Sequence, residues 1–166
     1  MVHDENSFTF TEEGGGAGLF STAKDLHQYT QMLLKEGELN GVRILTQESV
    51  LEMLKNQNPL SLTPRGLGRK IKKPLSILNK TSLAWSCGPN YPDDSCGHTG
   101  FTVTSLWFDP ISKQIIITLS NRDNLSIENN FEAIKRFRVK LHGLLNLNNS
   151  SRRVKPLKLT SVVTHE

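Results

Sequence analysis

The 166-residue sequence lacks several features that would assign it to a class at once. It has no run of about 18 apolar residues, so no membrane-spanning helix is predicted. Residues 1–5 contain neither the basic nor the apolar segment of a signal peptide. We therefore expect no membrane span, and the sequence leaves the cellular compartment undetermined.

Cysteine is scarce, with two residues, Cys87 and Cys96, on either side of a turn-rich loop. In an oxidising compartment they could close the loop as a disulfide, and two free thiols are an equally good interpretation. They lack the further ligands of a zinc site. The sequential polar residues His3, Asp4 and Glu5 are more typical of a turn than of a metal site. We expect neither a metal nor a cofactor.

Acidic residues are few at the C-terminal end, where residues 131–166 hold eight Lys and Arg against two Asp and Glu. Such an excess could contact nucleic acid or an anionic membrane. No aromatic residues interleave the basic residues of the tail, which favours a solvated helix face followed by a polar segment. We therefore expect no nucleic-acid partner. The predicted organisation is a domain over residues 1–145 and a basic tail over 146–166, disordered by composition.

Apolar spacing predicts helices over residues 22–36 and 46–56, capped by Thr22 or Ser21 and by Thr46. The expected buried positions are Leu26, Tyr29, Met32 and Leu33 in the first helix, and Val50, Leu51, Met53 and Leu54 in the second. A final helix is marked by Phe131, Ile134, Phe137, Leu141 and Leu144. We interpret His27, His142 and His165 as facing solvent.

The most informative stretch is residues 97–108, in which His98, Thr99 and Gly100 precede a run of β-branched and aromatic residues. An Asp-Pro turn at 109–110 and a second apolar run follow. This pattern predicts a hairpin with strands over 101–108 and 113–121 and polar atoms at its start. A glycine-bearing strand suits a substrate that pairs with the main chain. A simple turn at these three residues is an equally good interpretation of the stretch alone.

Four segments in a fixed order distinguish these interpretations: residues 2–6, 17–26, 40–45 and 97–110. Together they resemble the C-terminal part of the serine β-lactamase and penicillin-binding-protein-like family, which includes class C β-lactamases, D,D-peptidases and esterases. The resemblance covers roughly residues 2–140. It implies an α+β fold, an antiparallel sheet flanked by helices, incomplete on its N-terminal side. Strands and a helix from a missing N-terminal segment would otherwise cover apolar surface and a strand edge.

The resemblance also implies an acyl-transfer site acting on a small-molecule or peptide substrate, whether lactam, D-amino-acid peptide or ester. His98 would place a positive or hydrogen-bonding group beside that substrate, and Thr99 would offer its hydroxyl to a carboxylate or carbonyl. Gly100 would leave room for the substrate. The backbone N–H of Phe101 would be one donor to the oxyanion.

The family's other catalytic elements are not found. No Tyr-x-Asn motif is present, and the literal Ser-x-x-Lys match, Ser21 to Lys24, falls at a helix start where a capping role explains the serine. The sequence departs from the family pattern at two further positions: Gly16 stands where many relatives have His, and Val103 replaces a common glycine. We expect the substrate-wall portion of a serine hydrolase that lacks its nucleophile and is inactive alone. The alternative is a catalytically dead remnant that acts as a binding or interaction module.

Overall fold

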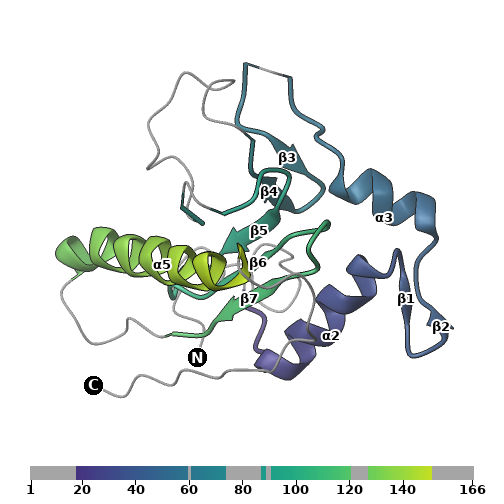
Figure 1. The fold of residues 1–166 in the computed structure, drawn as a ribbon, viewed down its shortest axis with the longest axis horizontal. Helices are drawn as coiled ribbons and strands as arrows, with labels where there is room; N and C mark the ends of the chain where they lie inside the picture. Colours follow the sequence, from purple (N-terminus) through teal and green to yellow (C-terminus); the bar gives the residue numbers. More distant parts are fainter. Residues whose placement is uncertain (1–17, 60, 74–86, 89–90, 121–126, 151–166) are drawn as a thin grey trace.

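The computed structural model describes residues 18–59, 61–73, 87–88, 91–120 and 127–150. Figure 1 shows the elements along the chain. The helices are α2 (Ala23–Leu34), α3 (Gln47–Leu54) and α5 (Ile127–Ser150). The strands are β1 (Glu38–Leu39), β2 (Val42–Arg43), β3 (Arg65–Gly66), β4 (Arg69–Ile71), β5 (Cys96–Thr99), β6 (Ser105–Phe108) and β7 (Ile115–Thr118).

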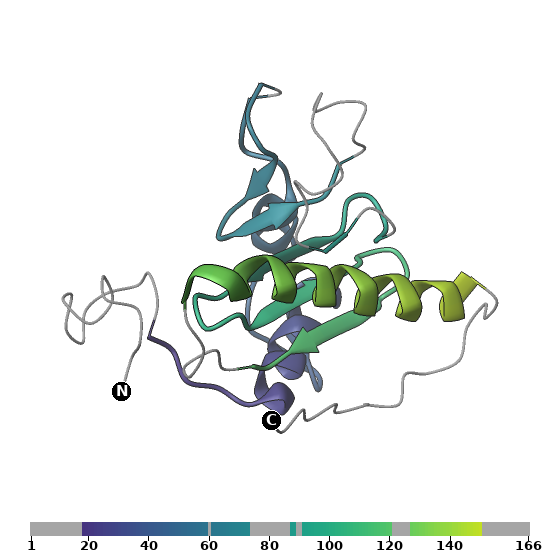
Figure 2. The ribbon, with the colours of Figure 1, turned by 90° about the vertical axis from the view of Figure 1, so that its left-hand side faces the viewer.

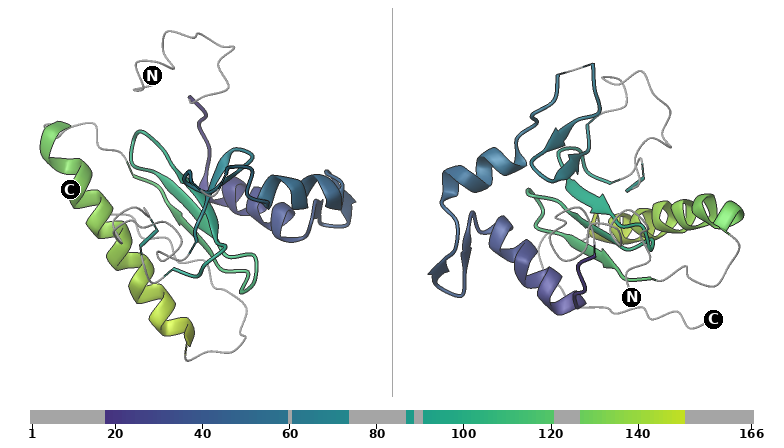
Figure 3. Two further views of the ribbon diagram at one scale, coloured as in Figure 1. Left: turned by 90° about the horizontal axis from the view of Figure 1, so that it is seen from above. Right: turned by 180° about the vertical axis from the view of Figure 1, so that it is seen from behind.

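The centre of the molecule is an antiparallel sheet of five strands in the order β3-β4-β5-β6-β7. Helix α5 lies along one face of this sheet, and α2 and α3 lie on the other side (Figures 2 and 3). The short pair β1-β2 forms a separate hairpin between α2 and α3. This arrangement confirms the predicted α+β class. None of the helices in the described residues is long and apolar enough to cross a membrane.

The predicted hairpin is present as β6 and β7, with shorter strands than expected. Its turn is held by the buried carboxylate of Asp109, which accepts the backbone N–H groups of Ile111 and Ser112 at 3.0 Å each. Asp109 fixes the turn because a side-chain oxygen replaces the backbone acceptors that a turn lacks.

The His-Thr-Gly triplet does not open that hairpin, contrary to the sequence-based prediction. His98 and Thr99 end the preceding strand β5, which pairs with β6 from Cys96↔Phe108 to Thr99↔Ser105. Gly100 donates its N–H to Thr104 at 2.8 Å and accepts from the N–H of Val103 at 3.1 Å, so residues 100–104 form a tight turn. Residues 101–104, which we predicted as strand, therefore form a turn held by local backbone hydrogen bonds.

Side chains alternate between the faces of the sheet, and each face has its own core. On the face toward α2 and α3, the buried cluster is Met32, Leu33, Val50, Ile71, Cys96 and Phe108. On the face toward α5 it is Cys87, Tyr91, Trp107 and Ile116. Cys87 and Cys96 therefore belong to cores on opposite faces, and both are free thiols, which leaves the disulfide interpretation without support.

Both predicted threonine caps are confirmed. The hydroxyl of Thr22 accepts the backbone N–H of Asp25, and that of Thr46 accepts the N–H of Ser49, each at 3.1 Å. Ser21 lies outside the cap, so its predicted capping role is wrong. The helices end at Leu34 and Leu54, two residues earlier than expected in each case.

Two of the predicted buried positions in these helices are exposed. Tyr29 is 42% exposed and Leu51 is 51% exposed. Met32, Leu33 and Val50 are buried as expected. Helix-period spacing predicts which face of a helix points inward. It does not predict which residues of that face are covered by the rest of the chain.

Helix α5 departs most from the sequence-based expectation. It buries His142 and Arg138, whereas Phe137 and Leu144 are 47% and 55% exposed, so His142 does not face solvent as predicted. The imidazole is accommodated because its Nδ1 contacts the carbonyl oxygen of Cys87 at 3.0 Å and its ring packs 5.2 Å from that of Tyr91. The helix continues to Ser150, beyond position 145 where we placed the boundary of the tail. Residues 151–166 lie outside the described residues.

Candidate functional site

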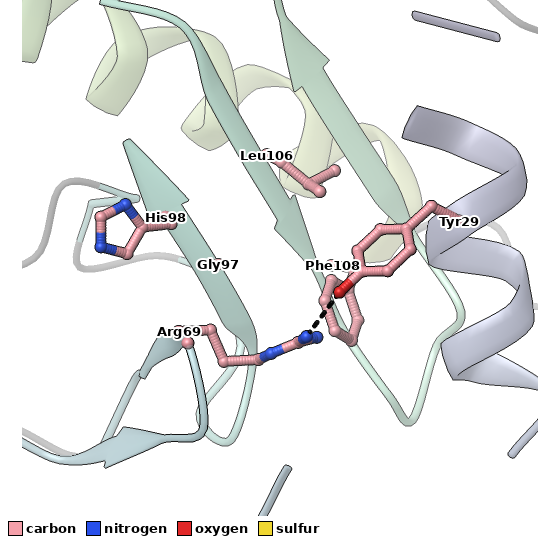
Figure 4. Close-up of a pocket in the computed structure, with 7 residues that line it drawn as sticks. Tyr29, Arg69, Gly97, His98, Leu106 and Phe108 are labelled. Atoms are coloured by element: carbon pink, nitrogen blue, oxygen red, sulfur yellow. Dashed lines mark hydrogen bonds between the residues drawn. The ribbon is translucent and has the colours of Figure 1, made fainter. Parts of the chain in front are cut away.

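The residues around His98 form a small open pocket of about 90 Å³ on the face of the sheet toward α2. Figure 4 shows its side chains from α2, β4, β5 and β6: the Arg69 guanidinium reaches the Tyr29 hydroxyl beside Phe108, and the His98 imidazole is directed away from this group. The lining residues are Tyr29, Gly68, Arg69, Gly97, His98, Leu106 and Phe108. Phe108 and Leu106 belong on this face because each lies opposite a residue of β5 with the same orientation, Cys96 and His98 respectively.

His98 is held as a neutral imidazole with a defined tautomer. Its Nδ1 lies 2.8 Å from the carbonyl oxygen of Thr99. A carbonyl oxygen can only accept, so Nδ1 carries the hydrogen and Nε2 presents a lone pair. Burial lowers the pKa of His98 below 6.5, helped by the charges of Lys70 and Arg65 and opposed by the bond to Thr99. At neutral pH the side chain is therefore a hydrogen-bond acceptor at Nε2.

Arg69 brings a cation into the same pocket. Its Nη2 donates to the hydroxyl of Tyr29 at 3.0 Å, and its guanidinium carbon lies 5.6 Å from the centroid of the Phe108 ring. The residue is only 7% exposed. Among the described ion pairs, none involves this guanidinium. The arrangement leaves a positive charge, positioned by a phenol and an aromatic face, without a described counter-ion.

Sequence reasoning did not identify Arg69 or Tyr29 as site residues. Arg69 lies in the proline-containing stretch 57–96 that gave no periodic signal, and Tyr29 fitted the apolar stripe of its helix. Tyr29 is 42% exposed, and its hydroxyl accepts a hydrogen bond from Arg69 of β4. A pairing 40 residues apart in the chain leaves no local pattern that could have revealed it.

Two glycines are required by close packing around β5. A Cβ on Gly97 would collide with the indole ring of Trp107, its partner across the ladder. A Cβ on Gly100 would collide with the hydroxyl of Thr104. Both glycines let β6 approach β5 closely, which fixes the position of His98 between them.

The other predicted site residues do not line this pocket. Thr99 is half-buried, and strand alternation puts it on the face opposite His98, beside Ser105. Gly100 and Phe101 lie in the turn after β5, and the side chain of Phe101 is 51% exposed. The structure thus places His98, Arg69 and Tyr29 in the lining of one pocket. Phe101 lies outside this lining, in the turn that follows β5.

Ser21 and Lys24 are both exposed and lie outside the pocket. The Ser21 hydroxyl makes one long contact, 3.5 Å, with the carbonyl oxygen of Thr22. The hydrogen bonds and ion pairs of the described residues include none between Ser21 and Lys24. The geometry fits a helix start better than a nucleophile with its base.

A family model described as Beta-lactamase matches residues 1–137. The chain is 27% identical over 128 residues to an N-acetylmuramyl-L-alanine amidase of Bacillus subtilis (strain 168), covering 76% of this chain and 27% of that protein. It is 28% identical over 130 residues to putative D-alanyl-D-alanine carboxypeptidases of Salmonella paratyphi B and Salmonella newport, covering 78% of this chain and 28% of each relative.

The chain thus spans little more than a quarter of the length of these curated relatives. The matched region contains α2, the whole five-stranded sheet and the start of α5. The order of its motifs, the antiparallel sheet between helices and the family match lead to one conclusion: this chain belongs to the Beta-lactamase family.

Proposed function

We propose that this chain forms the substrate-binding wall of a serine hydrolase that transfers an acyl group from a peptide, ester or lactam. The observation that supports the proposal best is the pocket at the end of β5, whose lining includes both His98, with its neutral imidazole, and the cation Arg69. Relatives named as a carboxypeptidase and an amidase favour a peptide-type substrate.

In this proposal the substrate lies along the end of β5 with its scissile carbonyl near the backbone of Phe101. The N–H of Phe101 would stabilise negative charge on the carbonyl oxygen as a nucleophile adds to it. His98 would accept a hydrogen bond at Nε2 and so orient the substrate or a neighbouring hydroxyl. The nucleophilic serine would come from outside this chain, because the exposed Ser21 lies outside the pocket.

Arg69 would bind an anionic group of the substrate. A cation without a described counter-ion, 7% exposed and stacked on Phe108, is well placed to pair with a carboxylate that displaces water from the pocket. This role suits a peptide with a free C-terminus better than a simple neutral ester.

Binding of N-acetyl-D-Ala-D-Ala to the chain, measured by calorimetry, tests the proposal. His98→Ala should weaken binding about five- to tenfold, the effect of losing one hydrogen bond. Arg69→Met should weaken it further, because an ion pair is lost. Lys24→Ala changes a single side chain at an exposed helix position outside the pocket, so it is the control and should leave the affinity unchanged. Equal binding by all four proteins would contradict the proposal.

Incubation with a fluorescent penicillin and with a nitrophenyl ester tests the assignment of the nucleophile. We expect no covalent adduct on the chain and no ester hydrolysis above that of buffer. An adduct mapped to Ser21 by mass spectrometry would overturn the assignment. Absence of both an adduct and dipeptide binding would favour the alternative, a catalytically dead module with another ligand.

A further inference from the structure

Three positively charged residues of β3, β4 and α5 interact electrostatically. Arg65 and Lys70 lie directly opposite each other in the β3-β4 ladder. Like charges in that position repel. Burial lowers the pKa of Lys70, and the charges of Arg65 and then Arg138 lower it further, so the three groups are close enough to interact.

Within the described residues, no carboxylate forms an ion pair with any of these three cations. The carboxylates of Asp93 and Asp94 are paired with Lys72 and Lys73. The positive charge of this cluster is therefore not compensated by the described part of the chain.

Arg138 is the most unusual member of the cluster because it is only 3% exposed. Its Nε and Nη1 have no hydrogen-bond partner among the residues that the structure describes. A buried guanidinium normally has both a counter-charge and bonded donors, since desolvating it otherwise costs several kcal/mol. Burial also lowers the pKa of this guanidinium. Helix α5 thus holds a buried cation that has no counter-charge among the described residues.

We propose that Arg65, Lys70 and Arg138 form a binding site for an oxyanion, a phosphate or carboxylate group of a ligand. Arg65 is exposed and Lys70 is half-buried, so both can contact an anion at the surface. Arg138, buried on α5, adds a third positive charge that acts on Lys70. The planar fork of an arginine and the ammonium of a lysine are the groups that proteins use for such anions.

The three residues of this site do not line the pocket of His98, although the charges of Lys70 and Arg65 reach its imidazole. Lys70 lies opposite Gly97 in the β4-β5 ladder and so belongs to the face toward α5, whereas His98 belongs to the face toward α2. The inference therefore stands whether or not the proposed hydrolase function is correct.

Thermal unfolding of the full chain in increasing inorganic phosphate, compared with sodium chloride at matched ionic strength, tests the proposal. A ligand that binds the folded state alone raises the midpoint. We expect a rise of about 4 °C at saturating phosphate for a chain of this size. Acetate in a parallel series identifies the anion: a rise with phosphate alone assigns a phosphate group, and an equal rise with acetate assigns a carboxylate.

The variant Arg65→Gln with Lys70→Gln should lose the response to both anions. The control variant Lys24→Gln with Lys35→Gln removes the same charge from exposed positions, and its midpoint should still rise with the anion. Arg138→Met should raise the midpoint without anion, because the uncompensated charge is gone, and should weaken the response. No rise beyond that in sodium chloride for the unmodified chain, or an equal rise in the Arg65 and Lys70 variant, would overturn the proposal.

Discussion

His142 shows how one buried side chain makes the stability of the fold depend on pH. Burial, with a further effect of the Arg138 charge, lowers its pKa from 6.5 to about 4, against the opposing effect of its bond to Cys87. The unfolded chain therefore takes up a proton at a higher pH than the folded chain. The free energy of unfolding should be highest above pH 6.5 and should fall as the pH drops from about 6.5 to about 4.

The difference between these pKa values corresponds to roughly 3 kcal/mol. Urea unfolding at pH 7 and pH 4.5 measures it. His142→Gln keeps an amide N–H that can donate to the Cys87 carbonyl but does not titrate, so the loss at low pH should be much smaller in this variant. An unchanged loss would show that other groups cause the pH dependence.

Val103 carries backbone strain next to the candidate site. Its φ is 76°, in the left-handed region that disfavours a β-branched residue, and its side chain is buried. The resemblance to the family implied a common glycine at this position, and the positive φ favours glycine here.

A pair of substitutions separates strain from burial at this position. Val103→Ala and Val103→Gly both remove the buried side chain, but only glycine relieves the left-handed strain. We expect the glycine variant to be more stable than the alanine variant by about 1 kcal/mol, measured by chemical denaturation. A more stable alanine variant would mean that the turn is not strained.

At the scale of elements, the helix starts were the most predictable feature. Thr22 and Thr46 stand three residues before the side chains or N–H groups they bond, a local pattern that sequence spacing displays directly. The strands were less predictable because residues 100–104 form a turn through bonds between Gly100 and Thr104 that no periodicity reveals. The buried face of α5 was missed for a related reason: it depends on Tyr91 and the Cys87 carbonyl, distant in sequence.

The cap of α2 gives a direct test at this scale. Thr22→Ala should lower the free energy of unfolding by about 1 kcal/mol, because the Asp25 N–H loses its acceptor. Ser21→Ala, one residue earlier and outside the cap, should have little effect. The reverse order in a denaturation experiment would assign the capping role to Ser21, the other candidate that the sequence offered.

At the scale of the whole molecule, the α+β class and the family followed from the order of four short motifs, and both are shown by the sheet and the family match. The chemistry of the site was less accessible. His98 was predicted from its motif and lines the candidate pocket, whereas Arg69 and Tyr29 are paired by a contact between α2 and β4 that exists only in the folded chain. Thr99 was predicted to face the substrate beside His98, and strand alternation directs it to the other face.

The central claim is that a substrate lies against the end of β5, within reach of His98 Nε2 and the Phe101 N–H. Nuclear magnetic resonance titration of the ¹⁵N-labelled chain with N-acetyl-D-Ala-D-Ala tests this claim most directly. The account predicts saturable shifts of the Phe101 amide and the His98 ring nitrogens, with the amides of α3 unchanged. Shifts confined to other parts of the chain, or none at concentrations where the dipeptide binds, would contradict it.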